Sequence, residues 1–581
     1  MREPIRLSPG QRDLVLNGLF EPGALPRLSL TYRISGPLDV DAFDVALRAV
    51  VAGHDALRLR FGAGPDGELR QWAENLPDPL VCQAVRAASE QQFDRYARKV
   101  FRADLEESWD LTEAPPLRAK LLRYSPELHV FGAALALTAC DARSRNIFEA
   151  DLWRAYRAAA LGERVCVGTE GFLAAVSARR RPASADLPSG LPVRCQFDST
   201  PVSALPAGHS LEIDLDDGEL AVARRRCREL RCTLFQLLVG MFGHALFERS
   251  AQDRLMIALR VDTRRHGESG VMGMFTDPRL LVLDRAGFNV AGRVSQVRRA
   301  VVDVMSGHPP ALDAVRENLL RHGQAAGVPP RLMLTVSHVN LAGAGEAGGP
   351  GLMVERGTHT PGFPSSTKGV ALQLITSPNR VRLLIDADAS VLPPDCLAEL
   401  ADRLRTLLTG APAGPAARAD VPDGMAQLTD VDGATLLVVD PAAIADVLRA
   451  HPAVREARVE VYAASQVRAE VVAAAPVTEG ELREHCYQAA RDHAYVVAPQ
   501  VIKVVRAEDE LVALLATAVP DAEPSGGFFA CGGNFAAVRR VRDQAAARGL
   551  PVPAHEDFAR ALTLRGIADR AVARAGRENG D

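Results

Sequence analysis

The segment that most constrains the fold of this chain is residues 127–156, which read ELHVFGAALALTACDARSRNIFEADLWRAY. A run free of Asp, Glu, Lys and Arg leads to a single carboxylate, Asp141. Shortly before this carboxylate stand Ala136 and Leu137, whose side chains can neither accept a proton nor donate a hydrogen bond. The segment therefore carries an acidic group where its apolar run ends, but no base beside it.

This segment resembles the core motif of condensation domains from nonribosomal peptide synthetases. In that family a strand ends in His-His-x-x-x-Asp-Gly, and the helix that follows closes with Leu-x-x-x-Tyr. Asp141 matches the aspartate, Ala142 replaces the glycine, and Leu152 and Tyr156 match the end of the helix. The two histidine positions hold the alanine and leucine just named, and the family uses the second histidine at the reacting amine. The resemblance implies that this catalytic group is lost.

Further motifs of the same family follow in the family's order over residues 1–408. They are LSPGQ (7–11), HDALRLRF (54–61), the strand region 109–124, the helix and strand of 233–261, and the segments 331–340 and 369–408. Gly273, Phe275 and Asp277 match a Gly-x-Phe-x-Asn motif, with aspartate in place of asparagine. The resemblance implies an α/β fold of two lobes, each like chloramphenicol acetyltransferase, arranged in a V. A tunnel between the lobes would admit two carrier-bound phosphopantetheine arms.

The resemblance also implies a structural role for Asp141, as one partner of an ion pair with an arginine from a distant segment. Arg264, or its neighbour Arg265, is the candidate partner. His54 and Arg58 are interpreted as part of a structural helix exit, although the family motif leaves a functional role open. The ion pair between Asp141 and its arginine would organise a site without itself supplying a base.

Two other residues could carry chemistry. Cys140 could form a thioester, but neighbouring strand residues point to opposite faces, so Cys140 and Asp141 cannot both face one site in regular strand geometry. We therefore favour a buried structural cysteine. His338 lies on an apolar segment that should border the tunnel, and a satisfied core histidine is the favoured interpretation there. Residual transfer by proximity of bound reactants keeps an enzymatic alternative open.

Composition narrows the class of protein. The 581 residues predict three to five structural units, since domains commonly hold about 100–200 residues. A net charge of −4 disfavours a nucleic-acid partner. The nine cysteines never occur as Cys-x-x-Cys, which predicts reduced thiols and neither a disulfide framework nor a metal site. Without a leader or a long apolar run, we expect a cytoplasmic protein with no membrane association.

A linker rich in Pro, Gly and Ala (409–424) precedes a second resemblance, to the small C-terminal subdomain of adenylating enzymes. The residues that match the family are Pro441, Ile444, His451, Pro452 and Val454, while Ala443 replaces a glutamate. In that family a Gly-Lys loop follows, whose lysine contacts the acyl-adenylate. Here Val505-Arg506 runs directly into the next expected helix, so the lysine loop is missing. No stretch of the 581 residues is left for the large nucleotide-binding subdomain, so we do not expect it in this sequence.

The last segment, 507–572, resembles a peptidyl carrier domain. Phe528-Phe529 and Gly532-Gly533 match the family motif, but Phe535 stands where the family has the serine that carries phosphopantetheine. A phenyl ring offers no hydroxyl, so no covalently attached cofactor is expected. The next helix carries three arginines that could dock a partner or form a solvated basic face, Arg539, Arg540 and Arg542.

These patterns predict five regions. They are a condensation-like N-lobe (1–180), a condensation-like C-lobe (181–408), the linker (409–424), a small α+β adenylation subdomain (425–506) and a helical carrier-like bundle (507–575). Three lost active features favour a non-catalytic adaptor that binds carrier domains, with contact to their phosphopantetheine, or other synthetase or tailoring proteins of a natural-product pathway. The alternative is an atypical condensation-type acyltransferase that forms an amide or ester without the histidine.

Overall fold

The computed structural model describes residues 4–578 except for 21–26, 66, 76–77, 107–114, 169–170, 180–193, 198–208, 287–288, 306–322, 325, 330–333, 341–346, 358–368, 378–379, 390, 411–413, 431, 520–525 and 562. The predicted lobe boundary at 180/181 and most of its connecting loop therefore lie outside the described residues, as do 109–114 and 331–333. The chain forms two compact units, 1–321 with 330–420, and 322–329 with 421–581.

The first unit holds a five-stranded sheet in the order β12-β2-β7-β6-β5. Its strands are β2 (Arg27–Ser35), β5 (Leu80–Ala84), β6 (Leu117–Ser125), β7 (Leu128–Ala136) and β12 (Met353–Arg356). All nine residues of β7 are buried. A strand covered on both faces has no solvent side, which explains why its sequence is a continuous run instead of an alternating one.

Helices cover both faces of this sheet. Phe131 packs with residues of α2 (Val40–Gly53) and α4 (Ala142–Ala160) in one core, while Val130 packs with Phe93 of α3 (Glu90–Glu106) in another. Helix α2 is capped by Asp39, whose side chain accepts a hydrogen bond from Ala42 N at 2.9 Å. A small separate sheet, β1 (Ile5–Arg6), β4 (Leu69–Ala73) and β3 (Leu59–Ala63), completes this half.

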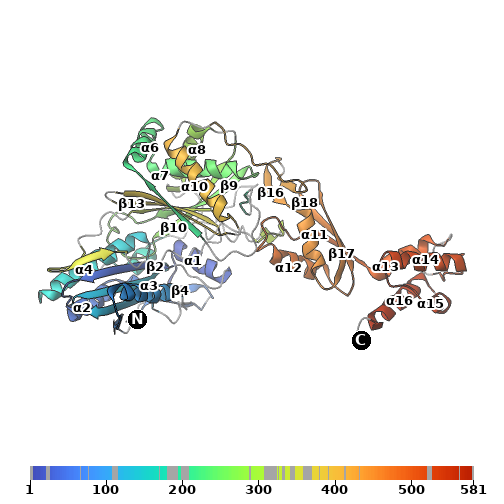
Figure 1. The fold of residues 1–581 in the computed structure, drawn as a ribbon, viewed down its shortest axis with the longest axis horizontal. Coiled ribbons are helices and arrows are strands. Elements are labelled where there is room, and N and C mark those ends of the chain that lie inside the picture. The colour runs from blue at the N-terminus through green and yellow to red at the C-terminus, as the bar shows by residue number, and fades with distance from the viewer. Residues whose placement is uncertain are drawn as a thin grey trace. The chain divides into compact units, whose positions relative to one another are not determined.

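The second half of the unit is a six-stranded sheet in the order β10-β9-β11-β13-β14-β8. Its strands are β8 (His209–Leu215), β9 (Arg254–Asp262), β10 (Thr276–Asp284), β11 (Leu334–Asn340), β13 (Val370–Ser377) and β14 (Arg380–Ala387). Its helices, which lie on one side of the sheet in Figure 1, are α6 (Asp217–Glu229), α7 (Leu234–Glu248), α8 (Val290–Met305) and α10 (Pro394–Thr409). Helix α7 is apolar nearly all round because it is buried between its neighbours.

Residues 347–357 join the two halves. Strand β12 belongs by sequence to the second half, yet it pairs antiparallel with β2 at the edge of the first sheet, with Met353 opposite Ser35 and Arg356 opposite Tyr32. Arg356 also forms an ion pair with the buried Glu149 of α4. The two-lobe boundaries drawn from the sequence therefore do not hold for this strand, which completes the first sheet.

The second unit contains a hairpin, a three-stranded sheet and a group of helices. The hairpin is β15 (Ala426–Thr429) with β16 (Thr435–Val439), and the sheet has the order β17 (Val454–Tyr462), β18 (Gln466–Ala473), β19 (Val501–Arg506). Helices α11 (Pro441–Arg449) and α12 (Glu479–Ala489) pack against this sheet. Four helices follow and share one core, α13 (Ala507–Thr517), α14 (Phe535–Ala547), α15 (His555–Arg560) and α16 (Leu564–Glu578). Strand β19 leads directly into α13 without an intervening loop.

Within the described residues, no single helix is long and apolar enough to cross a membrane; α6 and α7 meet that criterion only as a pair, bent by 95° at their break.

Candidate functional site

Asp141 lies just beyond the end of β7, at the start of α4. Its carboxylate caps that helix, with Oδ1 accepting a hydrogen bond from Ser144 N at 2.9 Å and lying 2.8 Å from Ser144 Oγ. Its side chain is only 3% exposed. A buried carboxylate needs a counterion, because burying an unpaired charge is costly.

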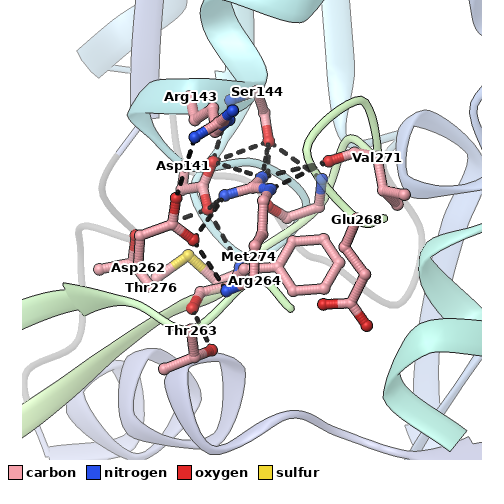
Figure 2. Close-up of polar contacts among 12 residues, drawn as sticks. Asp141, Arg143, Ser144, Asp262, Thr263, Arg264, Glu268, Val271, Met274 and Thr276 are labelled. Atoms are coloured by element: carbon pink, nitrogen blue, oxygen red, sulfur yellow. Dashed lines mark hydrogen bonds and ion pairs between the residues drawn. The ribbon is translucent and has the colours of Figure 1, made fainter. Parts of the chain in front are cut away.

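Arg264, which follows β9 of the second sheet, supplies this counterion. Nη1 donates to Asp141 Oδ2 at 2.8 Å and Nη2 donates to Oδ1 at 2.9 Å, a bidentate pair (Figure 2). The guanidinium carbon lies 4.4 Å from the centre of the Phe275 ring. Arg265 is not the partner, since its backbone N–H donates to Glu268 and its side chain is exposed.

Backbone groups complete the network and tie the two sheets together. Phe275 N donates to Asp141 Oδ2 at 3.1 Å, and Gly273 N donates to Ser144 Oγ at 3.0 Å. Gly273 has no room for a side chain, because a Cβ there would lie 2.0 Å from the Phe172 ring. The motif that the sequence matched at 273–277 thus packs onto the start of α4. Ser144 is a member of this network that sequence reasoning missed.

The two lost histidine positions are apolar in structure as well as in sequence. Ala136 is 1% exposed at the end of β7, and Leu137 is partly buried against the same core. Neither side chain has a polar atom, so the position in this motif where a proton would be accepted is filled by hydrocarbon.

Cys140 does not supply a replacement nucleophile. Its side chain is fully buried, and the thiol donates to Ala136 O at 3.3 Å. Burial, assisted by the neighbouring Asp141 charge, raises the pKa of the Cys140 thiol well above its ordinary value. The thiol therefore stays protonated, and the thiolate needed for thioester formation is not available.

His338 lies on β11 with its own partners. Its Nε2 is 2.9 Å from Thr376 Oγ1, and its ring stacks on Phe235 with 6.3 Å between ring centres. Partial burial of the ring lowers the pKa of His338 below its ordinary value, which favours the neutral form. The expectation of a satisfied core histidine is only half met, because His338 has a partner but keeps enough exposed surface that it is not a core residue.

His54 and Arg58 occupy the exit of α2. His54 Nε2 lies 2.8 Å from Asp151 Oδ2 in a buried contact, and Arg58 Nε donates to Val51 O at 3.1 Å. These contacts tie the end of α2 to α4 and to its own last turn. The structural interpretation of the motif accounts for both side chains.

Asp277, which stands where the family motif has asparagine, makes a second buried polar contact. Asp277 is 4% exposed and its Oδ1 accepts from Gly10 N at 3.0 Å, at the start of α1 (Pro9–Phe20). The free N–H groups of a helix N-terminus favour a carboxylate there. Asp277 also lies 3.6 Å from Arg279. The aspartate thus anchors the N-terminal helix to the second sheet.

Replacing Asp277 by alanine should lower the free energy of unfolding by about 1–3 kcal/mol, because Gly10 N loses its buried acceptor. Asp277→Asn retains an oxygen acceptor and should cost less than half of that. Urea unfolding followed by tryptophan fluorescence measures both variants. Equal losses for the alanine and asparagine variants would show that charge, and not the hydrogen bond, holds α1.

In the second unit, the structure separates the residues that the sequence singled out. Phe535 is the first residue of α14 and is 83% exposed, and Arg539 and Arg540 are exposed further along this helix. Arg542 instead contacts the His555 ring, with Nη1 at 2.8 Å from a ring nitrogen. Phenylalanine at position 535 has no oxygen to which a phosphopantetheine could be attached.

Comparison with known proteins finds proteins to which the first unit is similar. Residues 1–171 match the family model of the condensation domain. The first unit also resembles solved condensation-type structures over most of their length. The X-domain from teicoplanin biosynthesis aligns with a TM-score of 0.57 and 21% identity, covering 71% of this chain and 97% of that one. The first condensation domain of the calcium-dependent antibiotic synthetase aligns with a TM-score of 0.54 and 17% identity over 72% of this chain and 98% of that one.

Relatives by sequence are nonribosomal peptide synthetases. CymA of Salinispora arenicola, a probable synthetase of this kind, is 27% identical over 55% of this chain. Phosphinothricin tripeptide synthetase PhsB of Streptomyces viridochromogenes is 24% identical over 69% of this chain. The aligned part of this chain spans 4% of CymA and 35% of PhsB. The predicted condensation-like α/β fold is therefore confirmed for the first unit, and its relatives are peptide synthetases.

Proposed function

We propose that this chain is a nonribosomal peptide synthetase-like adaptor that does not itself catalyse condensation. It would bind carrier-bound intermediates, with contact to their phosphopantetheine, or partner enzymes of a natural-product pathway in the cytoplasm. One observation carries the proposal: Ala136 and Leu137 fill the histidine positions beside an intact Asp141–Arg264 pair. The architecture of the site is kept while its base is absent.

The Asp141–Arg264 pair can stabilise the fold even when the chain catalyses no reaction. Loss of a general base typically costs about 10²–10⁴-fold in rate. A bidentate pair with both side chains at most 4% exposed continues to hold the two sheets together, irrespective of any reaction. Selection for a folded binding surface therefore accounts for keeping Asp141 and Arg264 and for losing the histidines.

The second unit supports the same proposal. We assign 425–506 to an adenylation-type C-terminal subdomain and 507–575 to a carrier-like bundle. Strand β19 passes straight into α13, which leaves no loop for an adenylate-contacting lysine. Phe535 provides no attachment oxygen for a prosthetic arm. Each of the three regions would then contribute surface and no chemistry.

A structural neighbour gives this role a precedent. The X-domain of teicoplanin biosynthesis has been solved in complex with OxyB, and it aligns with 70% of this chain at a TM-score of 0.55 and 21% identity. At this identity the likeness concerns the fold. A condensation-type fold can thus serve as a surface for another protein, and we extend that use to this chain.

The Leu137→Ala substitution distinguishes the proposed adaptor function from the alternative acyltransferase function. In a reconstituted pathway, leaving out the chain should lower product formation at least tenfold, whereas Leu137→Ala should change it less than twofold, because no reacting group depends on that side chain. The variant is first checked for an unchanged fold by tryptophan fluorescence. A tenfold or greater loss in a folded Leu137→Ala variant would favour the atypical acyltransferase and refute the adaptor.

A further inference from the structure

An exposed pair of aromatic rings stands at the start of α14. Phe535 is 83% exposed and Phe529 is 43% exposed, and their ring centres lie 5.8 Å apart. Single exposed apolar side chains are ordinary on protein surfaces. Two adjacent phenyl rings are a larger apolar patch, and aromatic residues are the side chains most enriched where proteins bind one another.

The backbone that presents these rings is well held. Asn534 caps α14 by accepting from Ala537 N at 2.9 Å, which fixes Phe535 at the first helical position. The preceding turns are closed by Gly533 N donating to Phe528 O at 3.0 Å and Cys531 N donating to Gly527 O at 3.0 Å. A side chain at 533 would collide with the buried Phe528 ring, 2.5 Å away. Because this backbone is already held in place, little backbone entropy would be lost when the rings are bound.

A positive charge follows Phe535 on the same face of α14. Arg539 follows Phe535 by one helical turn and lies on the same face, whereas the exposed Arg540 is offset around the helix. Among the described residues, neither guanidinium forms an ion pair with a carboxylate. Arg542 is set apart by its contact with His555. An arginine without a counterion on the face of the projecting ring, with a second one further around the helix, complements a pocket that is apolar within and acidic at its rim.

We infer that Phe529 and Phe535 form an aromatic anchor that inserts into an apolar socket with an acidic rim on the partner protein. Arg539 and Arg540 then meet the rim carboxylates. This inference rests on the adaptor function proposed above and assigns the surface with which the adaptor holds its partner. The substitution of the attachment serine by phenylalanine would then exchange a covalent arm for a docking side chain.

Binding of the full chain to each separately purified enzyme encoded beside it tests the anchor. Phe535→Ala should weaken Kd by about 10- to 100-fold, the range of a central interface residue. Arg539→Glu should weaken binding about 10-fold and slow association, with a weaker dependence on salt. Since Phe535 is exposed, thermal unfolding of these variants should match that of the wild type.

Two matched controls separate the anchor from general effects. Arg548→Glu makes the same charge change about 14 Å further along, at the residue that caps the end of α14, and Tyr462→Ala removes another exposed ring, on β17 of this unit. Both should leave Kd within twofold of the wild type. If the wild type binds and Phe535→Ala binds equally well, the anchor is wrong and the adaptor function stands. If the wild type binds none of the enzymes, the anchor is wrong as well, and the adaptor function is confined to carrier-bound intermediates.

Photo-crosslinking tests the chemistry of the socket. Replacing Phe535 with p-benzoylphenylalanine should crosslink to apolar partner residues flanked by aspartate or glutamate. Crosslinks confined to a basic or uncharged surface would overturn the acidic rim.

Discussion

Replacing Arg264 by leucine should lower the free energy of unfolding of the first unit by about 3–5 kcal/mol, because it leaves the Asp141 carboxylate buried without its charge partner. The carboxylate would keep its hydrogen bonds from Ser144 and Phe275 but lose both guanidinium bonds. The chain has three tryptophans, and all of them precede residue 171, so urea unfolding followed by tryptophan fluorescence reports on this unit.

A double-mutant cycle identifies the source of the loss. Asp141→Asn with Arg264→Leu removes both charges, so the double variant should be destabilised by clearly less than the sum of the two single changes. Arg143→Leu, at an exposed side chain beside the pair, should cost less than about 0.5 kcal/mol. Additive losses at 141 and 264 would show that the two side chains act independently, contrary to the contacts in Figure 2.

Acid should weaken the first unit through His129, which is 1% exposed on β7 and has no hydrogen-bond partner for either ring nitrogen among the described residues. Burial, with a smaller contribution from Arg123, lowers the pKa of His129 to about 4. The unfolded chain binds this proton near its ordinary pKa of about 6.5. Stability is therefore complete above about pH 6.5 and falls as the pH drops toward 4, by about 2–3 kcal/mol for this group.

His129→Leu should remove most of this dependence and should not lower stability at pH 7, since an apolar side chain suits the buried strand. Unfolding free energies between pH 7 and pH 4.5 measure the effect. Some acid sensitivity should remain, because burial also lowers the pKa of His244. His266→Leu, at an exposed position, serves as the control. An unchanged pH profile in His129→Leu would show that this histidine is not buried as a neutral base.

Local sequence patterns predicted several of the helices and strands. The run before Asp141 encodes a strand buried on both faces, and Asp39 before an amphipathic segment encodes the start of α2. Local patterns could not predict which distant strands pair with each other. The pairing of β12 with β2 joins residues more than three hundred positions apart, and strand alternation does not name a partner.

The site shows the same division. The resemblance pointed to Asp141 and to two adjacent arginines in a distant segment, Arg264 and Arg265. Only the path of the backbone after β9 determines that Arg264, and not Arg265, reaches the carboxylate. Ser144 and the Phe275 N–H were missed because a serine and a backbone group give no sequence signal until the chain is folded. The exposure of Phe535 could not be predicted either. A phenylalanine near a glycine pair can be a buried core residue or an exposed one, and the sequence does not distinguish the two.

Mass spectrometry tests the central claim that the chain binds without catalysing. The purified full chain is mixed with acyl-loaded carrier domains and amine-loaded acceptor carriers of its pathway. Native spectra then follow complexes, and intact-mass spectra follow the acyl group. The account predicts a complex in which the acyl group stays on its original carrier. Transfer of the acyl group that depends on this chain and is lost when Leu137 is substituted would contradict it.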